Sequence, residues 1–306
     1  MRLVFAGTPP AALPSLDALF ASQHEVVGVV TRPDAPSGRG RTLQPSPVAV
    51  RATELGVPIL RPEHPRDKSF QAQLCELGPD CCPVVGYGAL VPRAVLAIPE
   101  HGWVNLHFSL LPAWRGAAPV QHAVLAGDRV TGATTFRLVP KMDAGPIFGT
   151  TSTPITSETT SGDLLDRLAA VGAALLVDTM DRIEAGSAVA QPQPVDGISL
   201  APKINVEDAQ VDWGAPAIQV DRLIRACQPA PGAWTLFRGD RFKINSAFVT
   251  DGGADPGQLL VTKSSVRVGT AAGLLELTQV QPSGRRAMGA ADWARGAGLA
   301  EQEHLG

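Results

Sequence analysis

The first 190 residues alternate between short apolar, β-branched runs and segments with helical spacing, and this alternation restricts the fold more than any other feature of the chain. Residues 2–7 and 25–31 are strand-like, and residues 11–22 between them place leucines on one helical face. The further strands predicted in this way are 58–60, 81–85 and 102–106, and the further helices are 47–55, 70–77 and 161–185. Strands that alternate with helices build a mainly parallel sheet covered by helices on both faces. We therefore expect a Rossmann-like α/β fold.

The pattern changes near residue 190. Residues 190–203 are rich in proline and have no periodicity, which is typical of a linker. Short apolar segments separated by turn residues then follow at 233–237, 242–249, 258–262, 265–268 and 274–280. Such a series of short strands predicts a small OB-like β-barrel. The expected domains are 1–189, which is Rossmann-like, a linker over 190–206, and the barrel over 207–306.

Length and composition set broad limits. A chain of 306 residues favours about two domains, and 44% hydrophobic with 18% charged residues excludes disorder as the main state. The net charge of −3 and the 5% of aromatic residues argue against a generally basic coat or a broad base-stacking surface for nucleic acid, although a local basic patch stays possible. Four cysteines without a CxxC pair, and no apolar run of 18 residues, favour a cytoplasmic protein with no membrane contact.

Two glycine-containing loops bear on nucleotide chemistry. The sequence has no GxxxxGK[ST], and the turn after the first strand, Gly7-Thr8-Pro9-Pro10, lacks the glycines of GxGxxG. Gly86-Tyr87-Gly88 follows a strand, but Val91 and Pro92 stand where a third glycine and a helix start are needed. We do not expect dinucleotide binding. This loop lies at the carboxyl edge of a parallel sheet, where ligands bind, so it can still line a pocket.

The residues most suggestive of chemistry lie in and after the strand that begins near residue 102. Strand alternation places Asn105, His107 and Ser109 on one face, and polar groups on a buried strand are costly unless they are paired. An asparagine amide can donate to a developing oxyanion, and a histidine can hold or move a proton near neutral pH. Asp143 lies in a tight loop before Gly145. If the Asp143 carboxylate faced His107, it would raise the pKa of the histidine and hold the imidazole ring in one orientation.

Other interpretations of these residues stay open at this point. His107 alone can be a structural histidine, and Asp143 alone a solvated loop acid. His107, Ser109 and Asp143 formally make a hydrolase triad, but Ser109 lacks the GxSxG turn and lies two residues from His107 on the same strand. A metal site built on His101 and His107 lacks a third ligand at a suitable spacing.

The order of these motifs resembles the active-site signature of the folate-dependent formyltransferases. The signature consists of Asn105-x-His107, Ser109-Leu110-Leu111-Pro112, Arg115-Gly116-Ala117-Ala118-Pro119 and Asp143-Ala144-Gly145. The start at residues 5–9, the glycine–arginine segment within 32–48 and the run at 281–288 resemble the branch of that superfamily that acts on methionyl-tRNA. The resemblance covers nearly the whole chain.

The resemblance implies a reaction and roles for individual residues. A formyl group would pass from 10-formyltetrahydrofolate, a co-substrate, to the α-amino group of methionine on initiator tRNA, with no metal and no covalent intermediate. Asn105 and protonated His107 would donate to the oxyanion, while Asp143 would keep His107 charged and help move the amine proton through water. The residues implied in folate binding are Ser109, Leu110, Leu111 and Pro112, with Tyr87 and Leu90 walling the pterin pocket.

The resemblance also implies contacts with tRNA. Arg39 and Arg41, between flexible glycines, would enter the acceptor-stem region, and Arg285 and Arg286 of the barrel would contact phosphates. Within residues 222–295 there are 10 Lys and Arg against 5 Asp and Glu, a local excess of positive charge. We expect a monomer. The alternatives are a folate-dependent formyltransferase or formyl-folate hydrolase acting on a small-molecule amine, and a non-catalytic tRNA-binding protein.

One departure from the family pattern concerns the turn after the first strand. The family usually has an acidic residue and then phenylalanine there, and this chain has Pro10 and Ala11. Proline is acceptable in a first helical turn. Because this chain lacks that phenylalanine, the resemblance does not say which residue contacts the methionyl side chain.

Overall fold

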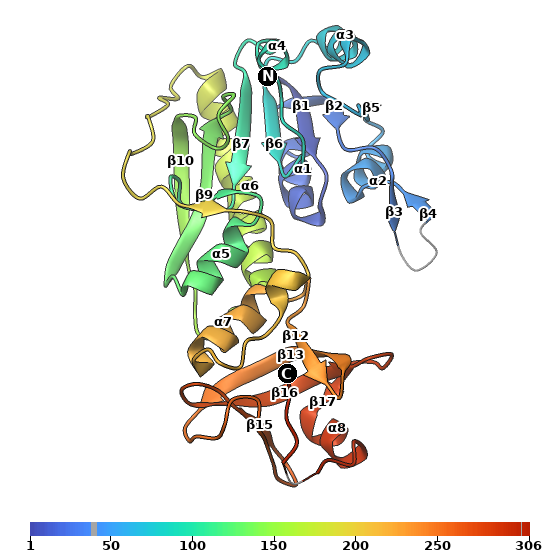
Figure 1. The fold of residues 1–306 in the computed structure, drawn as a ribbon. Coiled ribbons are helices and arrows are strands. Elements are labelled where there is room, and N and C mark those ends of the chain that lie inside the picture. The colour runs from blue at the N-terminus through green and yellow to red at the C-terminus, as the bar shows by residue number, and fades with distance from the viewer. Residues whose placement is uncertain (38–41, 301) are drawn as a thin grey trace. The chain divides into compact units, whose positions relative to one another are not determined.

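The computed structural model describes residues 1–37, 42–300 and 302–306, and the chain divides into two compact units. Unit 1 comprises Met1–Pro119, Val130–Pro154 and Leu165–Ala201, and unit 2 comprises Val120–Arg129, Ile155–Leu164 and Pro202–Gly306. The long helix α6 (Ser161–Glu184) begins in unit 2 and continues through unit 1 (Figure 1). Among the described residues, no helix is long and apolar enough to cross a membrane.

Unit 1 is built on one sheet whose strands follow the order β10, β9, β7, β6, β1, β2, β5. The pairs β1–β2, β1–β6, β2–β5 and β6–β7 are parallel, which confirms the expected fold class. The pairs β7–β9 and β9–β10 are antiparallel and form an edge that the sequence did not suggest. The strands are β1 (Arg2–Gly7), β2 (Glu25–Val30), β5 (Ile59–Leu60), β6 (Cys82–Val85), β7 (Trp103–His107), β9 (Val130–Arg137) and β10 (Ile147–Pro154).

Helices cover both faces of this sheet. Trp103 of β7 belongs to a buried cluster with Phe70 of α3 and Val95 of α4, whereas a Cβ placed on Gly172 of α6 would come within 2.9 Å of the Leu106 side chain. Trp103 and Leu106 point to opposite faces because side chains alternate along a strand. The helices of unit 1, besides α6, are η1 (Pro10–Ala12), α1 (Leu13–Phe20), α2 (Pro47–Glu54), α3 (Lys68–Leu77) and α4 (Arg93–Leu96).

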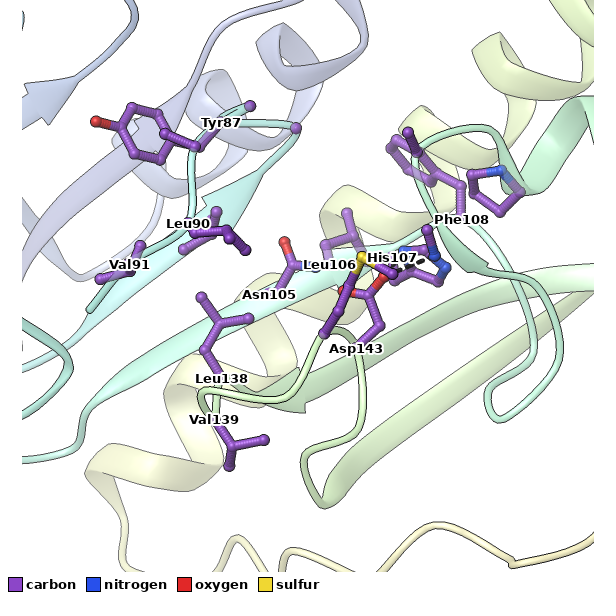
Figure 2. A pocket seen from close by; sticks show the side chains of 18 of the residues that line it. Tyr87, Leu90, Val91, Asn105, Leu106, His107, Phe108, Leu138, Val139 and Asp143 are labelled. Atoms are coloured by element: carbon purple, nitrogen blue, oxygen red, sulfur yellow. Dashed lines mark hydrogen bonds and ion pairs between the residues drawn. The ribbon is translucent and has the colours of Figure 1, made fainter. Parts of the chain in front are cut away.

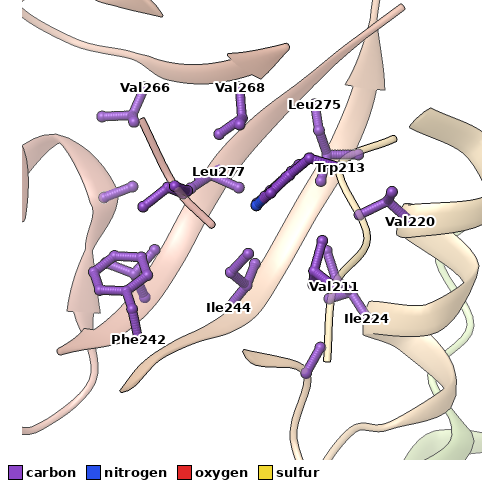
Figure 3. Packing of buried hydrophobic residues seen from close by; sticks show 14 of the residues in the cluster. Val211, Trp213, Val220, Ile224, Phe242, Ile244, Val266, Val268, Leu275 and Leu277 are labelled. Atoms are coloured by element: carbon purple, nitrogen blue, oxygen red, sulfur yellow. The ribbon is translucent and has the colours of Figure 1, made fainter. Parts of the chain in front are cut away.

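Unit 2 holds an antiparallel sheet that curls into a half-barrel around its own core. Its strands follow the order β12, β13, β16, β15, β14, with β17 paired to β16. Trp213, Phe242, Ile244 and Leu275 pack together in the buried centre of this sheet (Figure 3). The strands are β12 (Trp234–Phe237), β13 (Asp240–Thr250), β14 (Leu259–Val261), β15 (Val266–Gly269), β16 (Leu274–Pro282) and β17 (Met288–Gly289). The helices are α5 (Pro119–Ala126), η2 (Glu207–Ala209), α7 (Ala217–Ala226) and α8 (Ala290–Gly296).

Two small pairs of strands complete the description. The strands β3 (Ala35–Ser37) and β4 (Thr42–Gln44) are antiparallel. The predicted tRNA contacts Arg39 and Arg41 lie outside the described residues. The strands β8 (Arg115–Gly116) and β11 (Leu200–Ala201) are parallel, so the end of the proline-rich segment is bonded to unit 1.

Candidate active site

Asn105, His107 and Asp143 come together because a loop folds back over the middle of the sheet. Asn105 and His107 lie on β7 and pair with Phe136 and Thr134 of β9. The chain after β9 turns at Leu138, whose N–H donates to the Trp103 carbonyl, and returns to pair again at β10. Asp143 lies in this returning loop, so the two segments that the sequence singled out face each other (Figure 2).

The ring of His107 is almost completely enclosed. His107 is 6% exposed, its Nε2 lies 2.9 Å from the Trp114 carbonyl oxygen, and its Nδ1 lies 3.9 Å from Oδ2 of Asp143. A carbonyl only accepts, so we assign the proton of the neutral ring to Nε2, which leaves the Nδ1 lone pair toward Asp143. The Trp114 carbonyl thus determines the tautomer, and the basic nitrogen, Nδ1, faces Asp143.

The enclosure of His107 also affects the pKa of its ring. Burial lowers the pKa of His107 below its ordinary value, while the Asp143 charge and the Trp114 carbonyl act in the opposite direction. The Asp143 charge therefore opposes burial without overcoming it, because the carboxylate stands 3.9 Å from Nδ1 and the ring has lost its water. Burial thus favours the neutral form of the ring in this structure, whereas the resemblance implies that His107 acts in its charged form, and that role stays a prediction.

Asp143 is fixed from several directions. Its Oδ2 accepts a hydrogen bond of 2.8 Å from the Gly116 N–H. Its backbone carbonyl accepts one of 2.8 Å from Nε2 of Gln193, which also donates to the Gly145 carbonyl at 2.8 Å. Asp143 itself has a φ of 46°, in the left-handed region that few non-glycine residues adopt. The loop is thus held in a costly conformation by bonds to two other segments.

These side chains open into a cavity of about 580 Å³ within unit 1. In Figure 2, Tyr87, Leu90 and Val91 lie on one side of His107 and Phe108 lies on the other. The remaining lining residues are mostly apolar and include Val84, Leu96, Ala117, Pro119, Leu138, Val139, Pro140 and Met142. An apolar cavity with a few convergent polar groups is typical of a small-molecule site.

The residues predicted to bind folate fall into two groups. Tyr87 and Leu90 line the cavity; Leu90 is 80% exposed, and burial raises the pKa of the Tyr87 hydroxyl to about 12. Ser109, Leu110, Leu111 and Pro112 do not appear among the described residues that line the cavity.

Ser109 does not continue the polar face of β7, because the strand ends at His107 and the chain turns. The Ser109 hydroxyl is fully buried and donates to the Ala113 carbonyl at 2.6 Å, and the Ser109 carbonyl accepts from the Thr134 hydroxyl. The Leu111 N–H in turn donates to Thr134. These contacts build the turn that follows β7, and a role of the four residues in folate binding stays a prediction.

The remaining site predictions concern unit 2 and a metal site. Arg285 and Arg286 are exposed between β16 and β17 in unit 2. Across 1–37, 42–300 and 302–306, no three His, Cys, Asp or Glu side chains gather as a metal site would require. The residues that sequence reasoning missed are Trp114, whose carbonyl contacts His107, and Gln193, whose side chain donates to the Asp143 carbonyl from 50 residues away. No periodicity marks either of them.

Known proteins share both the sequence and the arrangement of this chain. The family described as formyl transferase matches residues 1–180, and its C-terminal domain matches residues 203–298. The chain therefore belongs to the formyl transferase family. A curated relative, the methionyl-tRNA formyltransferase of Streptomyces coelicolor, is 59% identical over 309 aligned residues that cover 100% of both chains. The resemblance to the branch that acts on methionyl-tRNA is confirmed by relatives of this kind.

Solved structures share the fold at lower identity. An N-formyltransferase from Helicobacter canadensis, crystallised with folinic acid and dTDP-3-aminofucose, has a TM-score of 0.68 at 16% identity, covering 92% of this chain and 99% of that one. A variant of HypX from Aquifex aeolicus has a TM-score of 0.68 at 19% identity and covers 99% of this chain. The chain spans about half of that HypX protein, 49% of its length.

Proposed function

We propose that this protein transfers a formyl group from 10-formyltetrahydrofolate to the α-amino group of methionine carried by initiator tRNA. The observation that carries the proposal is the meeting of Asn105, His107 and Asp143 at the wall of one apolar cavity. The choice of acceptor is supported by the relative that is 59% identical over the whole of both chains, and whose name states methionyl-tRNA as its substrate.

The apolar part of the cavity suits the folate. Tyr87, Leu90 and Val91 with Leu138 and Val139 offer an apolar enclosure for a flat pterin ring, next to the polar centre (Figure 2). A folate, folinic acid, was crystallised with the Helicobacter canadensis protein of the same fold. The bound co-substrate supplies an activated formyl carbon, and everything else in the reaction falls to the residues of the chain.

The three polar residues divide the work of the transfer. A free α-amino group has a pKa of about 8, so a useful fraction is already neutral at pH 7. Asn105 donates its amide N–H to the oxygen that becomes negative when the amine adds to the formyl carbon. His107 accepts the amine proton at Nδ1 and returns it to the folate nitrogen as that carbon–nitrogen bond breaks. Asp143 stabilises the imidazolium formed in between, from 3.9 Å.

The tRNA is held outside this cavity in the proposal. Arg39 and Arg41 contact the acceptor stem, and Arg285 and Arg286 contact phosphates as part of a tRNA-binding domain over residues 207–306. The catalytic domain spans residues 1–189, the residues 190–206 connect the two, and the protein acts as a monomer in the cytoplasm. The exposure of Arg285 and Arg286 is consistent with this role.

The test is a formylation assay that compares acceptors. The purified protein receives 10-formyltetrahydrofolate and one acceptor at a time: methionyl initiator tRNA, methionyl elongator tRNA, methioninamide, or a nucleotide-linked amino sugar. We expect rapid formylation of methionyl initiator tRNA alone. Equal turnover on either small amine without tRNA would favour the small-molecule alternative. Release of formate without transfer to any acceptor would favour a hydrolase.

A further inference from the structure

The proline-rich segment that follows α6 is fastened to the loops that build the site. The backbone of Gln191 exchanges two hydrogen bonds with Ile147, at 2.7 and 2.8 Å. Further along, the Ser199 hydroxyl accepts from the Trp114 N–H at 2.8 Å, and the Ser199 carbonyl accepts from the Arg115 N–H at 2.9 Å. The segment 191–201, named the strap below, therefore runs along unit 1 and contacts the residues next to His107 and Asp143.

Gln193 is the strap side chain that reaches the Asp143 loop. Its Nε2 donates to the carbonyls of Asp143 and Gly145, each at 2.8 Å, and its Oε1 accepts from Nε and Nη2 of Arg115 at 3.2 and 2.5 Å. Both amide donors are used, and the oxygen accepts from Arg115, which is 6% exposed. Most neighbouring strap residues are exposed, so the partial burial of Gln193 is specific to these contacts.

The loop that Gln193 holds needs an external restraint. Asp143 has a φ of 46°, and such a backbone persists only where the surroundings determine it. Two residues further on, the backbone of Gly145 packs closely against Arg137, since a Cβ on Gly145 would lie 1.7 Å from the Arg137 carbonyl oxygen. The Gly116 N–H holds the carboxylate end at 2.8 Å, and Gln193 holds the backbone end. Together they determine how far Oδ2 stands from His107.

We propose that Gln193 is a positioning residue for formyl transfer: it holds the Asp143 loop so that the carboxylate faces Nδ1 of His107. The proposal rests on the proposed function for the identity of the reaction. Gln193 acts through Asp143 and does not line the cavity among the described residues, so it is distinct from the groups that meet the substrates. The strap thereby acts as a catalytic support in addition to connecting the two units along the chain.

The experiment compares Gln193→Ala with Gln191→Ala. Gln191 is the matched control because it has the same side chain, lies two residues away, is exposed, and pairs with Ile147 through its backbone. We expect Gln193→Ala to lower kcat about 10²-fold, the effect of misplacing a catalytic group by about 1 Å, with the KM for each substrate within about twofold. Gln191→Ala should keep the wild-type kcat. Equal kcat values for the two variants would overturn the proposal.

A third variant separates the two ends of the amide. Gln193→Glu keeps an acceptor for Arg115 but loses both donors to the Asp143 and Gly145 carbonyls. We expect it to be as slow as Gln193→Ala, and a kcat close to wild type would overturn the proposal. Loss of folding in Gln193→Ala, judged by thermal denaturation, would also overturn it, because the side chain would then support unit 1 as a whole.

The pKa of His107 provides a readout that does not depend on activity. The Asp143 charge raises this pKa, so release of the loop should lower it further in Gln193→Ala and leave it unchanged in Gln191→Ala. The measurement is an NMR titration of the ring. An unchanged pKa together with a lost kcat would assign Gln193 a purely structural role and overturn the proposal. A wild type that does not formylate methionyl-tRNA would refute the proposed function, yet this titration would still decide whether Gln193 positions Asp143.

Discussion

Replacing Asp143 with asparagine tests the centre of the proposed mechanism with little change in shape. Asparagine tolerates the left-handed backbone that Asp143 adopts at a φ of 46°, and its carbonyl oxygen can still accept from the Gly116 N–H. The substitution therefore removes the negative charge and leaves the loop in place. Any change in rate then reports the electrostatic interaction with His107.

The distance in the structure sets the size of the effect. Nδ1 of His107 and Oδ2 of Asp143 are 3.9 Å apart, and their side chains are 7% and 14% exposed. Two unit charges at that separation interact by about 4 kcal/mol at an effective dielectric constant of about 20. If the imidazolium forms in the transition state, the loss of about 4 kcal/mol lowers kcat about 10³-fold.

The assay is single-turnover formylation of methionyl initiator tRNA with saturating 10-formyltetrahydrofolate. Asp196→Asn serves as the control because Asp196 is an exposed aspartate of the strap, and it should keep the wild-type rate. Binding of tRNA should be unchanged in both variants. A rate for Asp143→Asn within about tenfold of wild type would refute the reasoning, because the charge would then contribute little to the transition state.

Three further predictions follow from single features of the structure. Burial lowers the pKa of His107, so its ring should titrate below 6.5 in an NMR experiment on the unliganded protein, and a higher value would show that the Asp143 charge prevails. Gly116→Ala should lower the free energy of unfolding, measured by urea denaturation, by about 1–3 kcal/mol. The reason is that φ of Gly116 is 132° and the new Cβ would lie 2.5 Å from the Ala201 carbonyl oxygen, so an unchanged stability would contradict the strain expected at this position. Arg285→Ala and Arg286→Ala should each raise the KM for tRNA, leave kcat unchanged and reduce the salt slope of binding by about 1; an unchanged slope would argue against phosphate contacts.

The sequence predicts those helices and strands in which apolar residues recur at a regular helical or strand spacing. The strands β12 to β16 of unit 2 differ from their predicted ranges by at most two residues at either end, whereas β17 was not predicted, and α6 ends one residue before its predicted end. The strands β9 and β10 were missed because they are rich in threonine and glycine. Thr134 and Thr135 are fully buried in β9, where their hydroxyls are satisfied by the Ser109 carbonyl and by Thr179. Such pairing arises only in the folded chain, so the sequence pattern resembles an exposed loop.

The residues of the candidate site also differ in how far the sequence predicts them. Two-residue spacing identified Asn105 and His107, and the tight loop identified Asp143. The contributions of Trp114 and Gln193 could not be read in this way, because Gln193 lies 50 residues from Asp143 and the Trp114 contact with His107 uses a backbone carbonyl. The balance of effects on the pKa of His107 could not be predicted for a related reason: a charged partner is visible in a sequence, but the degree of burial that opposes it is set by packing.

The group that acts as nucleophile in the proposed reaction explains why so many hydrogen bonds of the site involve Asp143 and His107. Among the described residues that line the cavity there is no serine, cysteine or lysine, and burial raises the pKa of Tyr87, which does line it, to about 12. The hydroxyl of Ser109 is committed to the Ala113 carbonyl, and the buried Cys81 has its pKa raised to about 12. In the proposed direct transfer, the attacking group is instead the acceptor amine. Such a reaction needs only an oxyanion donor and a place for one proton, and the strain and hydrogen bonds of the site accordingly converge on Asp143 and His107.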